Sequence, residues 1–410
     1  MNKNYLTITL LIFLIVTLFL LPQNHISAQT TTLPRLGVWI NVFSAEKVLF
    51  SKEKADTLID ICSRCGIKDV YLQIYRSDKA YYNSDITDNS PYLARTSEAK
   101  EDLIKYLIKK GKENDIKLHA WVNLLSIAQN SDANILKKYG QNVLTRDQYG
   151  RTSMQKGNKD ELDKYYIREN QLFLEPGDTR VRSYLVNITY EIIAKYPGFS
   201  GLHLDYIRYP AAVPFIPGSK FTSHGISYGY TKANTDGFRA NSGVNIKNPS
   251  HTRSDYYLWD EWRRKNVTKL LKEISTKVKT LSPELQISCS FVPSIERTYL
   301  TLFQDWTEWL REGYADYIVA MNYTEDSEYM KIRSESVLVS DIADKIHIGL
   351  GAYLMKNAPG KFKTQIKSLK KIAPSGIAIY TYDNIAASKD LQNFLRIEFN
   401  CRPETINRRP

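Results

Sequence analysis

The sequence has few of the residues and motifs that metal, redox and nucleotide sites require. Four cysteines and six histidines occur in 410 residues. So few cysteines cannot form the disulfide framework of a small secreted domain, and no group of histidines, cysteines and carboxylates has metal-ligand spacing. No GxGxxG follows the first predicted strand, and no GxxxxGK[ST] phosphate loop is present. We therefore expect neither a metal nor a cofactor.

A single CxxC motif is formed by Cys62 and Cys65. Such a pair is typical of redox or zinc sites, but here no second CxxC follows and Cys62 falls on the apolar side of a predicted helix. We expect both cysteines to be structural.

Positive charge is abundant but not concentrated. The net charge is +12, and the basic residues occur in short, scattered groups such as 109–110, 137–138, 263–265 and 370–371. Most of these groups fall on the polar faces of predicted helices, which is typical of a solvated surface. We expect no nucleic acid partner, although a weak attraction to an anionic cell surface or polymer stays open.

Residues 1–28 have the features of a secretory signal peptide. Lys3 is their only charged residue, an apolar core runs from Leu10 to Leu21, and Pro22 ends it before a cleavage point at Gln29. An uncleaved anchor is the alternative, but the core is short for a bilayer span of about 20 residues. We expect export, either secreted or periplasmic, with no stable membrane insertion after the signal is cleaved.

The remaining chain alternates apolar strands with helices. Eight strands are predicted, at 36–43, 69–76, 117–125, from 201, and at 285–292, 315–323, 345–353 and 376–382. Their near-continuous apolar character indicates a parallel sheet that is covered on both faces. Alternation of this kind gives either a doubly wound sheet or a closed barrel, and eight units favour the barrel.

The predicted fold is therefore an α/β protein, a (β/α)8 TIM barrel in a single domain over residues 33–400. Residues 208–258 are a long polar insertion after the fourth strand, with little helical or strand period. Helices are predicted at 51–65, 98–114, 180–196, 259–281, 303–312, 335–344, 361–372 and 390–397. Residues 401–410 are expected to form a loose tail.

Polar and aromatic side chains gather where the predicted strands end, which is where a TIM barrel carries its chemistry. The residues at these ends are Asn41, Gln73, Arg76, Trp121, Asn123, Asp205, Arg208, Pro293, Glu296, Asn322, Tyr323, Tyr353, Tyr382 and Asp383. Aromatic faces stack on sugar rings, and amides and carboxylates bind hydroxyl groups. The chain also has 28 tyrosines, many of them in predicted βα loops. This combination favours a carbohydrate site.

Asp205 is the central candidate. Alternation along the strand that begins at Gly201 places His203 and Asp205 on one face, and Pro210 prevents the strand from continuing. A buried carboxylate needs a partner or a function, so Asp205 either pairs with Arg208, caps the next element, or reacts with substrate. Tyr206 has the opposite parity, and we expect it to lie outside the catalytic face.

Four segments resemble the bacterial glycosyl-hydrolase-like family 10, a former family of unknown function that is distinct from the family 10 xylanases. They are residues 173–185, 201–210, 259–267 and 305–318, and the similarity extends over about residues 33–385. The resemblance implies a TIM barrel that cuts glycosidic bonds in cell-wall or exopolysaccharide glycans. The family has two consecutive aspartates where this chain has Asp205-Tyr206, which would impair catalysis if the second aspartate were essential.

Glycoside hydrolysis ordinarily needs two carboxyl groups. Asp205 is the first, as acid, base or nucleophile. Glu296 is our choice for the second because it follows the fifth strand, next to the fourth in a barrel. Its alternatives are a solvent-facing role for Glu296 itself, or Glu325, Asp326 or Asp383 as the second group.

A substrate whose own acetamido group attacks would need only one protein acid. Asn322 and Tyr323 would then contact that group. The full set of expected substrate contacts is Gln73, Trp121, Asn123, His203, Arg208, Tyr209, Asn322, Tyr323 and Tyr382.

We therefore expect a secreted glycoside hydrolase whose partner is a polysaccharide or oligosaccharide. The main alternative is a non-catalytic barrel that binds polysaccharide at the cell surface. An exported barrel-type lyase is a third possibility.

Overall fold

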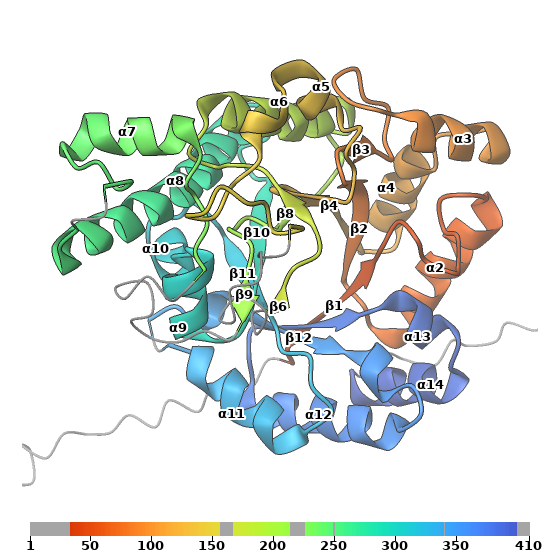
Figure 1. The fold of residues 1–410 in the computed structure, drawn as a ribbon. Helices are drawn as coiled ribbons and strands as arrows, with labels where there is room; N and C mark the ends of the chain where they lie inside the picture. Colours follow the sequence, from red (N-terminus) through yellow and green to blue (C-terminus); the bar gives the residue numbers. More distant parts are fainter. Residues whose placement is uncertain (1–32, 156–166, 214–225, 249–250, 340, 400–410) are drawn as a thin grey trace, which may run out of the picture. The chain divides into compact units, whose positions relative to one another are not determined.

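A ring of parallel strands surrounded by helices forms the protein in the computed structural model (Figure 1). The structure describes residues 33–155, 167–213, 226–248, 251–339 and 341–399. The predicted signal peptide (1–28) and tail (401–410) lie outside these residues. No helix in the described ranges combines the length and apolar character needed to cross a bilayer.

The barrel is closed by the pairing of its first strand with both its second and its last. Each strand pairs in parallel with the next along the chain, and β13 pairs with β1. The barrel strands are β1 (Arg35–Ile40), β2 (Asp69–Arg76), β4 (Lys117–Asn123), β8 (Gly201–Asp205), β10 (Gln286–Phe291), β11 (Tyr317–Met321), β12 (Ile346–Gly351) and β13 (Gly376–Tyr380). The short β3 (Lys79–Ala80) returns antiparallel along β2. The predicted TIM barrel is confirmed.

The helices cover the outside of the ring. They are α2 (Lys52–Cys65), α3 (Ser90–Ala99), α4 (Leu103–Glu113), α5 (Asn134–Tyr139), α6 (Thr179–Lys195), α7 (Lys232–Ser242), α8 (Arg253–Lys279), α9 (Ile295–Arg297), α10 (Trp306–Arg311), α11 (Ser327–Val337), α12 (Pro359–Ile372), α13 (Tyr382–Ala386) and α14 (Lys389–Glu398).

Helix α2 shows how local sequence sets these elements. The Ser51 side chain accepts a hydrogen bond from the Lys54 backbone N–H and so caps the helix, and Gly66 ends it with a φ of 73°. Leu58, Cys62 and Cys65 are buried on the inner side of the helix. Cys62 and Cys65 thus lie in the core.

Two helix predictions were wrong. The region predicted as one helix over 98–114 contains two helices, because Lys100 adopts a φ of 56° after α3 and Asp102 then caps α4. Helix α11 begins at Ser327, not near residue 335, because the Asp326 side chain accepts the Glu328 and Tyr329 backbone N–H groups. A capping residue, and not apolar periodicity, determines where α11 starts.

The insertion over 208–258 is more ordered than its composition predicts, although residues 214–225 and 249–250 lie outside the description. It contains α7, which Thr231 caps and which buries Phe238 against Trp259, with ring centroids 5.0 Å apart. Helix α8 begins at Arg253, six residues before the predicted start, because Thr252 and Asp255 form a capping box.

Two small antiparallel ladders join the long loops at the carboxyl ends of the strands. β5 (Ser126–Ala128) pairs with β7 (Leu172–Phe173), and β6 (Ile167–Arg168) pairs with β9 (Ala212–Val213). The second ladder links the segment that follows β4 to the segment that follows β8. These ladders position the loop residues of the site described below.

A buried ionic group lies at the opposite, amino end of the strands. Asp69, the first residue of β2, accepts hydrogen bonds from Arg35 and contacts His119 Nε2 at 2.8 Å. Burial acts to raise the pKa of Asp69, but His119 and Arg35 together lower it well below its usual value. Asp69 is therefore ionised, and it fastens β1, β2 and β4 to one another.

We predict that Asp69→Asn lowers the free energy of unfolding by about 2–3 kcal/mol at pH 7, because it leaves Arg35 without its carboxylate. Asp69 has a lowered pKa, so its contribution is present above the unfolded-state pKa of about 4 and declines as pH falls through the folded-state pKa. The difference between wild type and variant should therefore shrink below about pH 4. Urea unfolding at a series of pH values measures it.

The matched control is Asp115→Asn, which removes an exposed carboxylate that pairs with Lys68. Only a small change is expected there, because exposed pairs contribute little. Equal losses in the two variants at pH 7 would contradict the role assigned to Asp69.

Candidate active site

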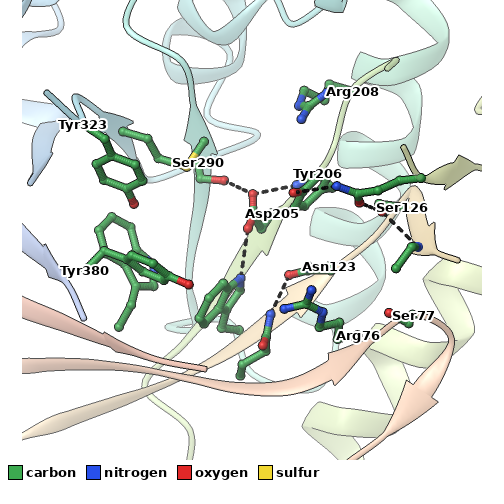
Figure 2. A pocket seen from close by; sticks show the side chains of 16 residues that line it. Arg76, Ser77, Asn123, Ser126, Asp205, Tyr206, Arg208, Ser290, Tyr323 and Tyr380 are labelled. Carbon is green, nitrogen blue, oxygen red and sulfur yellow. Dashed lines mark hydrogen bonds between the residues drawn. The ribbon is translucent and has the colours of Figure 1, made fainter. Parts of the chain in front are cut away.

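A pocket opens at the carboxyl ends of the barrel strands (Figure 2). The space within it, including the open solvent at its mouth, is about 820 Å³. Its lining residues come from the ends of the strands and from the loops that the two small ladders join: Trp39, Gln73, Arg76, Ser77, Trp121, Asn123, Ser126, Ala128, Gln171, Asp205, Tyr206, Arg208, Ser290, Met321, Tyr323 and Tyr380.

Asp205, the last residue of β8, lies at the centre of a set of hydrogen-bond donors (Figure 2). Its Oδ1 accepts from the Ser290 hydroxyl and from the Tyr206 backbone N–H at 2.8 Å. Its Oδ2 accepts from Trp121 Nε1 at 3.3 Å. β4 and β10 flank β8 in the barrel, so they bring Trp121 and Ser290 to either side of this carboxyl group.

The pKa of Asp205 is raised. Its side chain is buried, and burial disfavours the charged form. The donors from Ser290, Tyr206 and Trp121, together with the charge of Arg208, oppose this effect without cancelling it. Asp205 therefore holds its proton to a higher pH than an ordinary aspartate does, which is the state that a proton donor needs.

Arg208 pairs with Glu169 and not with Asp205. Its two terminal nitrogens reach the two oxygens of Glu169 at 2.6 and 3.1 Å, and the Ala211 backbone N–H donates to the same carboxylate. Burial acts to raise the pKa of Glu169, but Arg208 lowers it on balance. The simple alternative of an Asp205–Arg208 ion pair is thus wrong, because Arg208 already has a bidentate partner.

Tyr206 lines the pocket, which corrects the expectation that it lies outside the catalytic face. The strand ends at Asp205, and Tyr206 has a φ of 54°, so the alternation of the strand does not reach it. Gln171 Nε2 donates to the Tyr206 hydroxyl at 3.4 Å, and the Arg208 guanidinium lies 4.9 Å from its ring centroid. Tyr206, which the resemblance pairs with the second of two consecutive aspartates, therefore lines the pocket.

Two predicted contacts form an amide pair beside Asp205. Gln73 Nε2 donates to Asn123 Oδ1 at 3.0 Å, while Gln73 Oε1 accepts the Val42 backbone N–H at 3.2 Å. Asn123 is opposite Asp205 in the register of β4 and β8. No acceptor for Asn123 Nδ2 is found among the described residues, so this group can donate to a ligand.

Aromatic rings form the facing wall. Tyr323 and Tyr380 are stacked with centroids 5.7 Å apart and an interplanar angle of 23°, and Trp39 meets Tyr380 at 6.2 Å. Tyr353, which is 46% exposed, extends the group outward and lies edge-on to Tyr323 at 6.1 Å. Such faces suit the apolar faces of sugar rings.

Several predicted contacts lie elsewhere. His203 is inside the barrel, where its Nε2 accepts from Trp39 Nε1 at 3.1 Å and its Nδ1 is 2.9 Å from Ser288 Oγ. Asn322 is buried and donates to the Met330 carbonyl on α11. Tyr209 donates to Glu175, and Tyr382 is buried in α13. Strands β11 and β13 each end two residues earlier than predicted, and Asn322 and Tyr382, which follow these ends, are buried outside the pocket lining.

The predicted strand-end residues and contacts that the structure does bring together are Gln73, Arg76, Trp121, Asn123, Asp205, Arg208 and Tyr323. Sequence reasoning missed Trp39, Ser290 and Tyr380 as lining residues. Ser290 and Trp39 have the strand parity that points into the barrel and could have been found from it. Gln171 lies in a segment without a period, and nothing in the sequence marked it.

None of the candidates for the second carboxyl group lines the pocket. Glu296 is exposed on α9 and is not a lining residue. Asp383 accepts from Ser44 and the Ala45 N–H, Asp326 caps α11, and Glu325 pairs with Lys361. Among the described lining residues, Asp205 is the only carboxylate.

A metal site and a serine-hydrolase site are two other kinds of active site that a hydrolase can have. In the described part of the chain, no group of three or more histidines, cysteines and carboxylates could hold a metal ion. A GxSxG pattern, typical of serine hydrolases, occurs at residues 225–229 within the insertion. Ser227 accepts a hydrogen bond from Arg263, and among the described residues no histidine is its partner, as activation of a serine nucleophile would require.

The chain is similar to several known proteins. Glycosyl hydrolase YngK of Bacillus subtilis (strain 168) is 25% identical over 338 residues, which cover 76% of this chain and 58% of the relative. The chain thus spans little more than half the length of that relative. Glycosyl hydrolase DigH of Escherichia coli O6:H1 is 21% identical over 332 residues, 72% of this chain and 67% of that protein.

Among solved structures, the glycoside hydrolase domain of PgaB (BpsB) from Bordetella bronchiseptica aligns with a TM-score of 0.62 at 14% identity. The alignment covers 91% of this chain and all of that domain, and at this identity it shows a shared fold. Residues 35–365 match the family described as Glycosyl hydrolase-like 10, which is most of the barrel. The chain therefore belongs to the glycosyl hydrolase-like 10 family.

Proposed function

We propose that the protein is an exported glycoside hydrolase that cleaves glycosidic bonds in a cell-wall or exopolysaccharide glycan, with Asp205 as its proton donor. One observation carries the proposal: a buried carboxyl group with a raised pKa lies in an aromatic-lined pocket at the carboxyl ends of the barrel strands. Membership of a glycosyl-hydrolase-like family supports it. The features of residues 1–28 support export.

The hydrogen bonds around Asp205 indicate which oxygen carries the proton. Oδ1 accepts two donors, from Ser290 and from the Tyr206 N–H, whereas Oδ2 accepts only Trp121 Nε1 at the longer distance of 3.3 Å. The proton is therefore best placed on Oδ2. In the reaction this oxygen gives its proton to the glycosidic oxygen as the bond from that oxygen to the anomeric carbon breaks, and Asp205 becomes a carboxylate.

The attacking group is best supplied by the substrate. Asp205 is the only carboxylate among the described lining residues, and Glu169 is held ionised in its pair with Arg208. A 2-acetamido sugar needs no second protein carboxylate, because its carbonyl oxygen attacks the anomeric carbon and forms a cyclic intermediate that water then opens. Asp205, now ionised, takes the proton from that water. The role of Glu296 as the second carboxyl group stays a prediction, because Glu296 does not line the pocket.

A non-catalytic polysaccharide-binding barrel is the second candidate. The observation that favours it is Tyr206, which stands in the pocket where the family has its second aspartate. If that aspartate were essential for catalysis, the aromatic wall and the amide pair would still bind a glycan.

We predict that Asp205→Asn lowers kcat by about 10²–10⁴-fold, because it removes the proton donor while it keeps the shape of the side chain. The measurement is release of reducing ends from a panel of bacterial cell-wall and exopolysaccharide glycans, with glycan binding followed in parallel. Unchanged turnover in the variant would rule out the role of Asp205. Binding by both proteins without any release from wild type would support the non-catalytic barrel.

We further predict that Ser290→Ala moves the alkaline limb of the pH profile of kcat/KM upward by about one pH unit. The Ser290 hydroxyl stabilises the carboxylate form of Asp205, so its loss raises the pKa of Asp205 further. A proton donor with a higher pKa stays protonated, and active, to a higher pH.

Ser288→Ala is the matched control for this prediction. Ser288 lies on the same face of β10, and its hydroxyl contacts His203 and makes no hydrogen bond to Asp205. Its alkaline limb should stay at the wild-type pH. An equal shift in both variants, or no shift in Ser290→Ala, would show that this hydroxyl does not set the pKa of the reacting acid.

A further inference from the structure

Arg76 is a cation in the pocket that the proposed reaction does not use. It is the last residue of β2, it lines the pocket, and it is partly buried. Its guanidinium lies 5.0 Å from the ring centroid of Phe43, a side chain that is 69% exposed at the rim. Stacking of this kind holds the plane of the guanidinium and leaves its N–H edge available.

Arg76 has no carboxylate partner in the described part of the chain, in contrast to Arg208, which has both oxygens of Glu169. Burial raises the pKa of Asp205, and the hydrogen bonds that its carboxyl group accepts come from Ser290, the Tyr206 N–H and Trp121, not from Arg76. Among the described residues, the pocket thus has one arginine whose charge a carboxylate balances, Arg208, and one whose charge no carboxylate balances, Arg76. A partly buried cation without a partner costs free energy unless a ligand supplies the anion.

An irregularity in β2 aims Arg76 into the pocket. The register between β2 and β4 shifts between Gln73 and Tyr75, so the strand alternation is interrupted there. Gln73 and Arg76 consequently both line the pocket although they are three residues apart, while Tyr75 is buried in the core and donates to Asp78. Bulges that redirect a side chain are frequent next to active sites.

The position of Arg76 relative to Asp205 defines what it can bind. β2, β4 and β8 are neighbours in the barrel, so Arg76, Asn123 and Asp205 follow one another around the rim. Figure 2 shows Arg76 on the Asn123 side of the pocket. Neighbouring strands are about 4.8 Å apart, which puts the strand of Arg76 about 10 Å from that of Asp205. Arg76 therefore reaches a substituent of the bound sugar and not the bond that breaks.

We propose that Arg76 binds a carboxylate on the sugar that occupies this pocket, so that the substrate is an acidic glycan. The inference rests on the proposed function and specifies its substrate class. The guanidinium fork matches the two oxygens of a carboxylate, and Asn123 Nδ2 offers a further donor beside it. A neutral sugar leaves the charge of Arg76 uncompensated, which gives the site a preference for the acid.

The carboxylate could come from two kinds of sugar. In a uronic acid it replaces the terminal hydroxymethyl group of the ring, and in a muramic-type sugar it is part of a lactyl ether. Each has a neutral counterpart that differs only at this group. The pairs are 2-acetamido-2-deoxyglucuronic acid with N-acetylglucosamine, and N-acetylmuramic acid with N-acetylglucosamine, so all three sugars carry the 2-acetamido group that the proposed reaction uses.

The test is equilibrium binding of these three sugars to the whole protein, by calorimetry or by the fluorescence of Trp39 and Trp121, which both line the pocket. In wild type one acid should bind at least about tenfold more tightly than its neutral counterpart, and added salt should reduce the difference. Arg76→Gln should abolish the preference and leave the neutral sugar's affinity unchanged. Arg76→Lys should restore part of it.

Arg333→Gln is the matched control, because Arg333 also stacks on an exposed tyrosine, Tyr329, but does not line the pocket. It should keep the wild-type preference. Whichever acid shows the preference identifies the source of the carboxylate. Binding needs no bond cleavage, so this outcome is independent of whether Asp205→Asn affects turnover.

The proposal is overturned if wild type binds neither acid, or binds each acid no more tightly than its neutral counterpart. It is also overturned if Arg76→Gln weakens acidic and neutral sugars equally, because Arg76 would then act only by shaping the wall.

Discussion

The pairing of β13 with β1 is the constraint on which the rest of the molecule depends. A parallel sheet that closes on itself brings the carboxyl ends of all its strands to one rim. Trp39, Asp205 and Tyr380 are far apart in the sequence, yet each belongs to the end of a barrel strand and each lines the same pocket. The loops at that rim can then form the walls of the pocket, because the pairing of the strands alone closes the barrel.

The two ends of the barrel each contain a buried aspartate, and the pKa values of these two aspartates are shifted in opposite directions. Asp69 at the amino end has an arginine and a histidine in contact, so its charge is kept and serves stability. Asp205 at the carboxyl end has only neutral donors in contact, from a hydroxyl, an indole and a backbone amide, and its pKa rises. The same side chain is a structural anion in one place and a proton donor in the other because of the charge of its neighbours.

The barrel could be predicted from the sequence because its strands and helices are set by neighbouring residues. Apolar runs mark the strands, and residues such as Ser51 and Gly66 mark where a helix begins and ends. Asp205 and Trp121 were predictable as strand-end residues of the right parity. Tyr206 was not, because its positive φ interrupts that parity. Arg76 was predicted as a strand-end residue but not as a substrate contact, and a shift of register between β2 and β4 precedes it.

Other residues of the site depend on contacts that strand and helix periods do not encode. Gln171 reaches the pocket, and Glu169 reaches Arg208, because short ladders fix an aperiodic loop. Asn322 was misplaced for a related reason: its amide is bound by α11, a helix whose start depends on one capping side chain, and so it turns away from the pocket.

The ladder of β6 with β9 and the bidentate Glu169–Arg208 pair connect two loops that leave different strands of the barrel. Gln171 belongs to one loop, and Tyr206 and Arg208 belong to the other, yet all three form one wall. A change in the length or course of either loop would displace the partner residues on the other. The two segments are thus expected to diversify together during evolution, as a paired unit, while the strands beneath them stay constant.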